Sequence, residues 1–148
     1  MPHIVTIESD VELPEDIHQA TISSLVSHVL ASENVHDDWQ VGVQFVDDPN
    51  MQAAHAEFMD IDEPTDIMTF PYADEDDIWG DNEAGGDLII SVDTARENAE
   101  VAGWSHADEL HFLVAHGILH LLGWDDHSAA DRSRMLDRQR ELLQTWSR

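Results

Sequence analysis

The segment HGILHLLGWDDH, residues 116–127, contains the histidine spacing of a metal site. His116 and His120 are four residues apart, so on a helix both imidazoles project from one face and can bind the same ion. Gly123 allows the chain to leave the helix in a left-handed conformation and turn back, which brings a third ligand towards the ion. Three protein ligands leave one coordination position for water, which is typical of a catalytic zinc rather than a structural one. The pattern therefore predicts one catalytic zinc ion per chain.

The third ligand is either Asp126 or His127. In the related protease signature His-xxx-His-xx-Gly-xx-His, the third position corresponds to Asp126, and His127 follows one residue later. Both side chains bind zinc, but imidazole is the better ligand and one extra loop residue costs little. We therefore expect His116, His120 and His127 to be the metal ligands and the catalytic residues. Asp125 or Asp126 is then placed to accept a hydrogen bond from a ligand.

Gly117 occupies the position where a zinc protease has its catalytic glutamate. In such a protease, the glutamate takes a proton from the zinc-bound water and passes it to the leaving nitrogen. A peptide has a poor leaving group and needs that proton. Phosphodiester cleavage can instead use a metal-activated water or a ribose hydroxyl, with the metal offsetting charge on the phosphate. The glycine therefore argues against a minimal zinc protease and is compatible with phosphodiester cleavage.

The hydrophobic pattern along the chain predicts an α+β fold, with a small mixed four-stranded sheet packed against about five helices. The length of 148 residues is that of one domain, so we expect residues 1–148 to form a single metal-dependent hydrolase domain. The zinc site is expected on a C-terminal helix and the turn after it. The predicted strands are 3–9, 39–46, 64–72 and 86–92; the predicted helices lie within 13–35, 48–59 (capped by Asp48), 93–103 (capped by Asp93), 105–123 (capped by Ser105) and 128–146; residues 73–86 are an exposed connection.

The charge of the chain is strongly negative. It has 32 acidic residues against 6 basic ones, all arginine, which gives a formal net charge of −26. A lysine-free, acidic surface is a solvation pattern of proteins in salt-rich cells, where screening shortens the reach of each charge. It is also the surface expected for binding a basic partner, and the sequence leaves both interpretations open. Four arginines follow the histidine motif, where they either bind an anionic ligand or offset neighbouring acids: Arg132, Arg134, Arg138 and Arg140.

Cysteine is absent, which excludes disulfides, thiolate metal sites and cysteine nucleophiles. The N-terminal segment has no signal-peptide pattern, and no apolar run approaches the length of a membrane span. We therefore expect a soluble cytoplasmic protein. The seven histidines outside the motif, among them His111, have no comparable setting, and we expect them not to bind metal.

Two further segments, PTDIMTFP at 64–71 and GDLII at 86–90, combine with the histidine motif to give a family resemblance. The three segments together resemble the YbeY family of bacterial endoribonucleases and rRNA maturation factors, and their order and spacing agree from about residue 40 to the end. The resemblance implies an α+β fold with zinc held by three histidines. It also implies single-strand-specific cleavage of RNA in small-subunit (16S) rRNA 3′-end maturation and in ribosome quality control. The implied partners are single-stranded ribosomal RNA and the small subunit or its proteins, with no membrane and no DNA.

The resemblance also implies that Thr65, Phe70 and Asp87 belong to segments that line the cleft above the metal. From the residues alone, Thr65 is equally well a turn residue, Phe70 a core aromatic and Asp87 a residue that orders a loop.

Two departures from the family pattern matter. The family's Tyr-Asp-His is Trp-Asp-Asp-His here, at 124–127, and the position where the family often carries an arginine thought to meet the phosphate holds Met59. Either the C-terminal arginines bind phosphate instead, or the nuclease activity is weak. In the second case the protein is a ribosome-associated assembly factor with a structural zinc and little catalysis.

Overall fold

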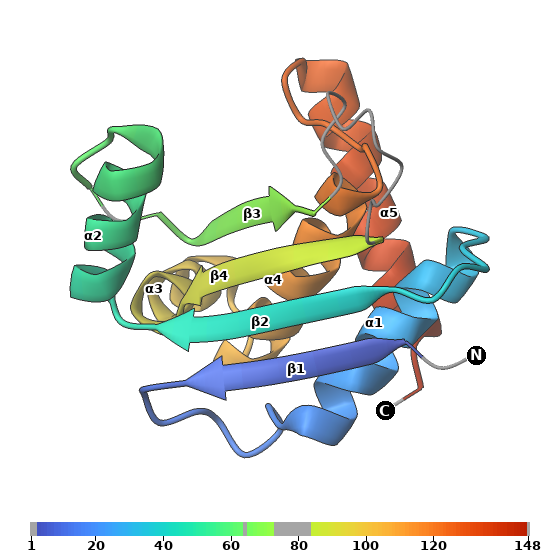
Figure 1. Cartoon of the computed structure of the whole chain (residues 1–148), viewed down its shortest axis with the longest axis horizontal. Helices are drawn as coiled ribbons and strands as arrows, with labels where there is room; N and C mark the ends of the chain where they lie inside the picture. The colour runs from blue at the N-terminus through green and yellow to red at the C-terminus, as the bar shows by residue number, and fades with distance from the viewer. Residues whose placement is uncertain (1–2, 64, 73–83, 148) are drawn as a thin grey trace.

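Strands and helices alternate up to β3, which is followed directly by β4, and helices alone form the rest of the chain (Figure 1). The computed structural model describes residues 3–63, 65–72 and 84–147. Most of the connection expected over residues 73–86 lies outside the described residues. The elements are β1 (Ile4–Ser9), α1 (Gln19–Ser32), β2 (Gln40–Val46), α2 (Asp48–Met59), β3 (Ile67–Pro71), β4 (Gly85–Ser91), α3 (Val92–Ala102), α4 (His106–Leu121) and α5 (Ala129–Thr145).

The four strands form one mixed sheet in the order β1-β2-β4-β3. The first three in this order are parallel, and β3 pairs antiparallel with β4, with Ile67 opposite Ile90 and Phe70 opposite Asp87. The predicted α+β fold with a mixed four-stranded sheet and five helices is confirmed.

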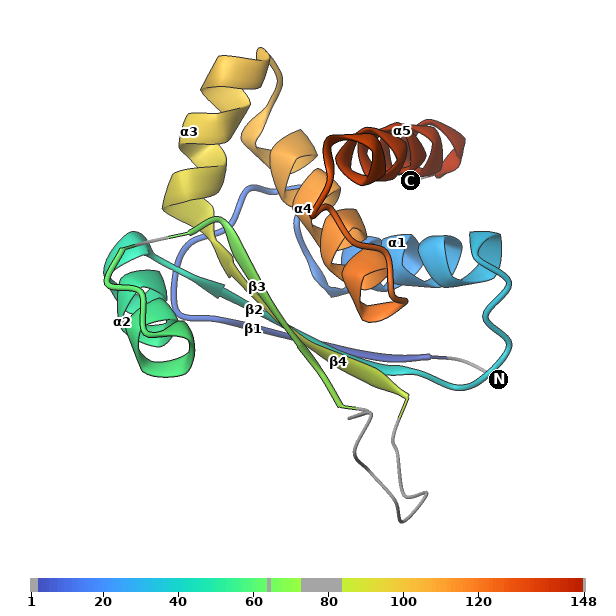
Figure 2. The ribbon, with the colours of Figure 1, turned by 90° about the horizontal axis from the view of Figure 1, so that it is seen from above.

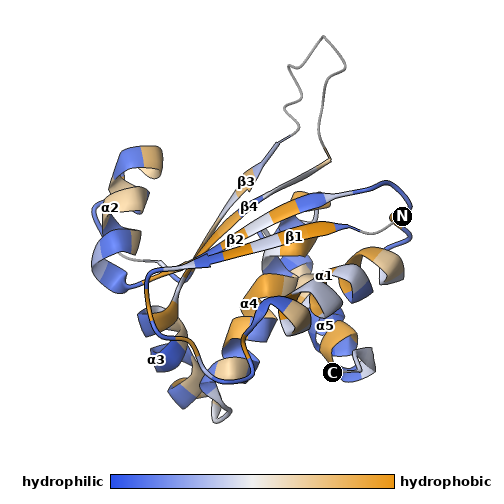
Figure 3. Cartoon of the chain, turned by 60° about the horizontal axis from the view of Figure 1, so that its bottom comes forward, coloured by the Kyte–Doolittle hydropathy of each residue, from blue (hydrophilic) through white to orange (hydrophobic). Residues whose placement is uncertain are grey.

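Helices α1, α3, α4 and α5 lie on one side of the sheet, and α4 lies between the sheet and α5 (Figure 2). Hydrophobic residues gather on α1 and α4 and on the sheet, while α2 and α3 are more hydrophilic (Figure 3). Between the sheet and the helices on this side lies the core. Its large side chains that are fully buried include Ile22, Leu25, Leu30, Phe45, Leu88, Ile90, Leu110, Ile118 and Leu119. None of the described helices is both long and apolar enough to span a membrane.

The two ends of α4 follow the sequence signals. Ser105 caps its first turn by accepting a hydrogen bond from the Asp108 backbone N–H at 3.0 Å, as predicted. Gly123, just after its last turn, has a φ of +102°, a left-handed conformation that glycine adopts without strain. The turn predicted after the histidine pair is therefore present.

The caps of α2 and α3 are Asp47 and Ser91, and the predicted caps Asp48 and Asp93 were wrong. Both predicted residues lie one or two positions inside a helix, where their carboxylates join the two helices. Asp48 Oδ1 accepts from the hydroxyls of Ser91 at 2.5 Å and Thr94 at 2.6 Å. Asp93 Oδ2 accepts from the Asp48 backbone N–H at 2.9 Å, so the start of α2 is fixed against the start of α3.

Gly117 is a point of close approach between α4 and the sheet. A Cβ at this position would lie 2.6 Å from Leu88 Cδ2 and 3.0 Å from Ile67 Cδ1. Leu88 is fully buried, so its side chain has little room to move. The glycine therefore determines how deeply α4 packs onto β3 and β4.

Gly117→Ala is expected to lower the free energy of unfolding by up to roughly 2 kcal/mol. The overpacking, typically about 1–3 kcal/mol, outweighs the gain of about 1 kcal/mol that alanine brings to a helix interior. Guanidinium denaturation measures the change, and an unaltered dependence on denaturant shows that the same surface is exposed on unfolding. A variant as stable as the original would mean that Leu88 and Ile67 move aside.

Candidate metal centre

His116 and His120 come together one turn apart on α4, as predicted. Their Nε2 atoms are 2.9 Å apart, and their rings meet edge to face with centroids 4.5 Å apart. Both side chains are partly exposed, at 19% and 25%. Most of the other residues of α4 are buried, so this pair lies on the partly exposed side of a largely packed helix.

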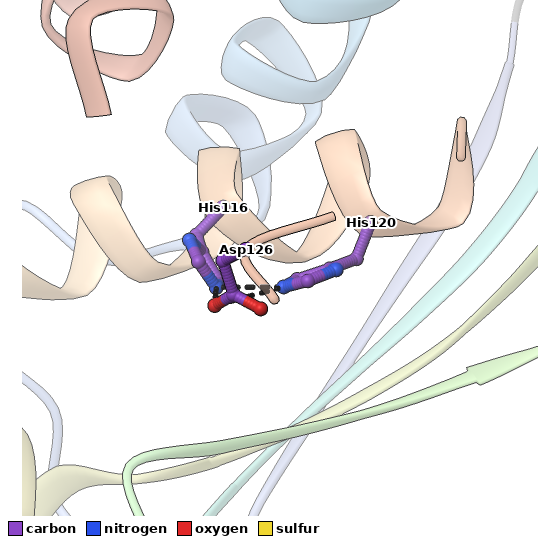
Figure 4. Close-up of side chains that lie close together, drawn as sticks. All are labelled: His116, His120 and Asp126. Carbon is purple, nitrogen blue, oxygen red and sulfur yellow. Dashed lines mark hydrogen bonds and ion pairs between the residues drawn. The ribbon is translucent and has the colours of Figure 1, made fainter. Parts of the chain in front are cut away.

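Asp126 completes a group of three donors. Its Oδ2 lies 3.9 Å from His116 Nε2 and 3.7 Å from His120 Nε2, and Figure 4 shows the carboxylate and both imidazoles directed towards one point. Ligands of a tetrahedral zinc are about 3.4 Å apart when each bond is near 2.1 Å. The three donor atoms all lie within 4.8 Å of one another, so they fit a single metal ion.

His127 does not join this group of donors in the described part of the chain. Its side chain is exposed, and its backbone N–H donates to Asp125 Oδ1 at 3.3 Å. The position three residues after Gly123, which the protease spacing indicates, is Asp126, and that residue reaches the histidines without an extra loop residue. The ligand role of His127 stays a prediction.

The surroundings of His120 favour the neutral imidazole. Burial lowers the pKa of His120 and the neighbouring His116 lowers it further, against Asp126 and a backbone hydrogen bond at Trp124, which raise it. Only a neutral imidazole has a lone pair for a metal. The packing of α4 thus keeps this side chain in the form that binds metal.

Gln139 on α5 is a contact of the site that the sequence analysis missed. Its Oε1 lies 3.0 Å from His116 Nδ1, the ring nitrogen directed away from Asp126. The available signal was a polar residue within the apolar stripe of α5, between Met135 and Leu142. All three residues are buried.

Gly117 faces the sheet rather than the histidine cluster. Any side chain there would point at Leu88 and Ile67. A glutamate at this position, as in a zinc protease, would be buried against apolar groups instead of reaching the metal donors. The packing of α4 therefore agrees with the argument against proteolysis.

Phe70 and Asp87 lie on the sheet face opposite α4. They pair directly across β3 and β4, whereas Leu88, their neighbour in β4, contacts Gly117 of α4. Successive residues of a strand point to opposite faces, so Phe70 and Asp87 face away from α4, while Ile67 and Leu88 of the same two segments face it. That these segments line a cleft above the metal stays a prediction. With Phe58 and Tyr72, Phe70 and Asp87 line a hollow of about 580 Å³ on the open face, where the Tyr72 hydroxyl donates to Asp87 at 2.5 Å.

The arginines after the motif mostly pair with acids on α5 itself or with the residue that follows α1. Arg134 pairs with Asp131, Arg140 with Asp137, and Arg138 with both Glu33 and Glu141. Of the arginines that the structure describes, Arg132 alone forms no ion pair. Met59, at the position of the family's arginine, is the last residue of α2 and is 57% exposed.

The comparisons with known proteins cover nearly the whole chain. A sequence model described as Endoribonuclease YbeY matches residues 3–147. The chain belongs to the YbeY family. Relatives named Endoribonuclease YbeY include one from Bacillus licheniformis, 40% identical over 88% of this chain and 86% of its own length. Another, from Beutenbergia cavernae, is 36% identical over 91% of this chain and 93% of its own length.

A solved structure has the same fold. The solution structure of TM1509 from Thermotoga maritima superposes with a TM-score of 0.61, covering 95% of this chain and 87% of that one at 23% identity. The mixed sheet with its helices is therefore a fold that this YbeY family member shares with an experimentally determined structure.

Proposed function

We propose that this protein is a metal-dependent endoribonuclease that cleaves single-stranded RNA. The convergence of two imidazoles and one carboxylate on a single point, in a chain of the YbeY family, carries this proposal. The proposed setting is the cytoplasm, in 3′-end maturation of small-subunit (16S) rRNA and in ribosome quality control. The proposed partners are single-stranded ribosomal RNA and the small subunit or its proteins.

The proposed ligands are His116, His120 and Asp126, and the proposed ion is Zn²⁺. Two imidazoles and one carboxylate suit zinc and leave a position open for water. A divalent ion held there would offset charge on the phosphate oxygens and lower the pKa of a bound water. The 3.7 and 3.9 Å distances from Asp126 Oδ2 to the two imidazoles favour this carboxylate over His127 as third ligand.

Arg132 is the proposed phosphate contact in place of the arginine that the family carries where this chain has Met59. On α5 it lies seven residues, or about two turns, before Gln139, so the two share one side of the helix, and Gln139 contacts α4. Its charge is not offset by an ion pair within the described residues, unlike that of Arg134 or Arg140. In a chain of net charge −26, few groups attract a polyanion such as RNA, and an arginine that is not paired with an acid is one of them.

A second candidate function is a ribosome-associated assembly factor with a structural zinc. Met59 favours it, because a phosphate-binding arginine is missing there. Protein that binds small-subunit particles but leaves their RNA intact would support this second function.

Cleavage of a single-stranded 16S rRNA 3′ precursor is expected to depend on the metal. Removal of the metal by a chelator, or His120→Ala, should abolish cleavage, while zinc should restore the chelated protein. His55→Ala is the matched control, because His55 lies on α2 and bonds to the Glu63 carbonyl. Assays at about 0.1 M and 1 M salt span screening lengths of about 10 Å and 3 Å, which covers a salt-adapted surface. Cleavage that is equally fast in His120→Ala would contradict the proposal.

Asp126→Asn and His127→Gln separate the two candidates for the third ligand. Loss of a direct ligand should weaken zinc binding by more than the roughly 10- to 100-fold typical of an outer contact, and we expect this of Asp126→Asn. His127→Gln should bind zinc nearly as the original chain does. Competition with a chromophoric chelator measures both affinities. The reverse order of effects would assign the ligand role to His127.

Arg132→Gln is expected to weaken RNA binding about tenfold more than Arg134→Gln. Both changes remove one positive charge from the same exposed part of α5, but Arg134 is already paired with Asp131. Fluorescence anisotropy with a single-stranded RNA measures the affinities, and zinc binding serves as the control for an intact site. Equal effects of the two substitutions would remove the case for Arg132.

A further inference from the structure

Gln139 is a fully buried amide of α5 whose two ends contact two different groups of α4. Its Nε2 donates to the backbone carbonyl of Phe112 at 3.3 Å, and its Oε1 lies 3.0 Å from His116 Nδ1. Its side chain is 0% exposed, and Met135 and Leu142 on the adjacent turns are also buried. Solvent therefore has no ready access to replace either bond.

The contact with Phe112 determines which way the amide points. A carbonyl oxygen can only accept a hydrogen bond, so the NH₂ end of Gln139 must face Phe112 and the oxygen must face His116. The oxygen also can only accept, so neutral His116 must carry its ring proton on Nδ1. This is the opposite of the tautomer that histidine prefers in water, where the proton is on Nε2.

The nitrogen left without a proton is the one at the metal centre. His116 Nε2 lies 2.9 Å from His120 Nε2 and 3.9 Å from Asp126 Oδ2. With its proton on Nδ1, the imidazole presents a lone pair at Nε2 to the position shared by the three donors. The hydrogen bond also fixes the rotation of the ring, as outer contacts of metal-binding histidines do.

We propose that Gln139 is a positioning residue of the metal centre, which holds His116 in the Nδ1–H tautomer with Nε2 ready to bind the ion. The inference rests on the proposed function, because it assigns a role in binding the metal that the nuclease would use. α5 then has a second role besides packing, because its Gln139 prepares His116 for metal binding.

The test compares Gln139→Met, Gln139→Glu and Leu142→Val. Methionine has a similar length but offers no comparable acceptor, whereas the glutamate carboxylate can still accept from Nδ1–H. Leu142→Val is the packing control, since it removes one methylene from the same buried face of α5. Two readouts are needed: the His116 tautomer from ¹⁵N NMR of the metal-free protein, and zinc affinity from chelator competition.

The metal-free original chain should have His116 protonated at Nδ1. Gln139→Met should shift the proton towards Nε2 and weaken zinc binding about 10- to 100-fold, while Gln139→Glu and Leu142→Val should keep both the tautomer and the affinity. An unchanged tautomer and affinity in Gln139→Met would overturn the inference, and so would an Nε2–H tautomer in the original chain. If Gln139→Met fails to fold, two measurements still test the inference: the tautomer of His116 in the original chain and the zinc affinity of Gln139→Glu. A tenfold loss of zinc affinity in Gln139→Glu counts against the inference.

The two readouts also separate this inference from the proposed function. A chain that binds no zinc would contradict the proposed metal dependence, while the tautomer of His116 in the metal-free protein would still test Gln139. Conversely, if Gln139→Met still cleaves RNA in a zinc-dependent way and binds zinc as tightly as the original chain, the proposed function stands and the role of Gln139 is removed.

Discussion

The close packing of α4 on the sheet is the constraint on which the rest of the structure depends. Two glycines allow it: a Cβ at Gly117 would meet Leu88, and a Cβ at Gly86 would lie 2.5 Å from Leu121. Because position 117 faces the sheet, His116 and His120 occupy a neighbouring face of the helix that the sheet does not cover. Position 117, where a zinc protease has its catalytic glutamate, is thus a glycine that packs against the sheet. The site is left with metal donors and no carboxylate from that position.

The candidate metal centre joins three parts of the chain. α4 supplies two imidazoles, the turn after Gly123 supplies Asp126, and α5 supplies the Gln139 amide that contacts His116. An ion that binds only the folded arrangement stabilises it by its binding free energy. Metal binding and the docking of α5 on α4 are therefore expected to be linked, even though Gln139 is not one of the three donors.

Much of this architecture is visible in the sequence because it depends on local patterns. The spacing of His116 and His120, the cap at Ser105 and the left-handed turn at Gly123 are properties of a few neighbouring residues, and the structure contains each of them. The third donor was harder to predict, because the path of the turn decides whether residue 126 or 127 reaches the ion. Ligand chemistry favoured His127, and the geometry brings Asp126 to the histidines.

The features that sequence reasoning missed depend on contacts between distant segments. Gln139 lies 23 residues from the histidine it contacts, and only the docking of α5 reveals the pair. The faces taken by Phe70 and Asp87 follow from the register of β3 against β4, which a single strand does not specify.

The acidity of the chain contributes little to the stability of its fold, because few of its charges are needed to hold the helices in place. Most described arginines lie within ion pairs with acids on their own helix, and such exposed pairs contribute little to stability. A net charge of −26 therefore acts mainly outside the core, where it repels a polyanion at low salt and is screened within about 3 Å at 1 M salt. Binding of RNA by such a surface requires either high ionic strength or local cations at the site. A divalent ion at the three donors and Arg132, which forms no ion pair within the described residues, are the cations proposed for that role.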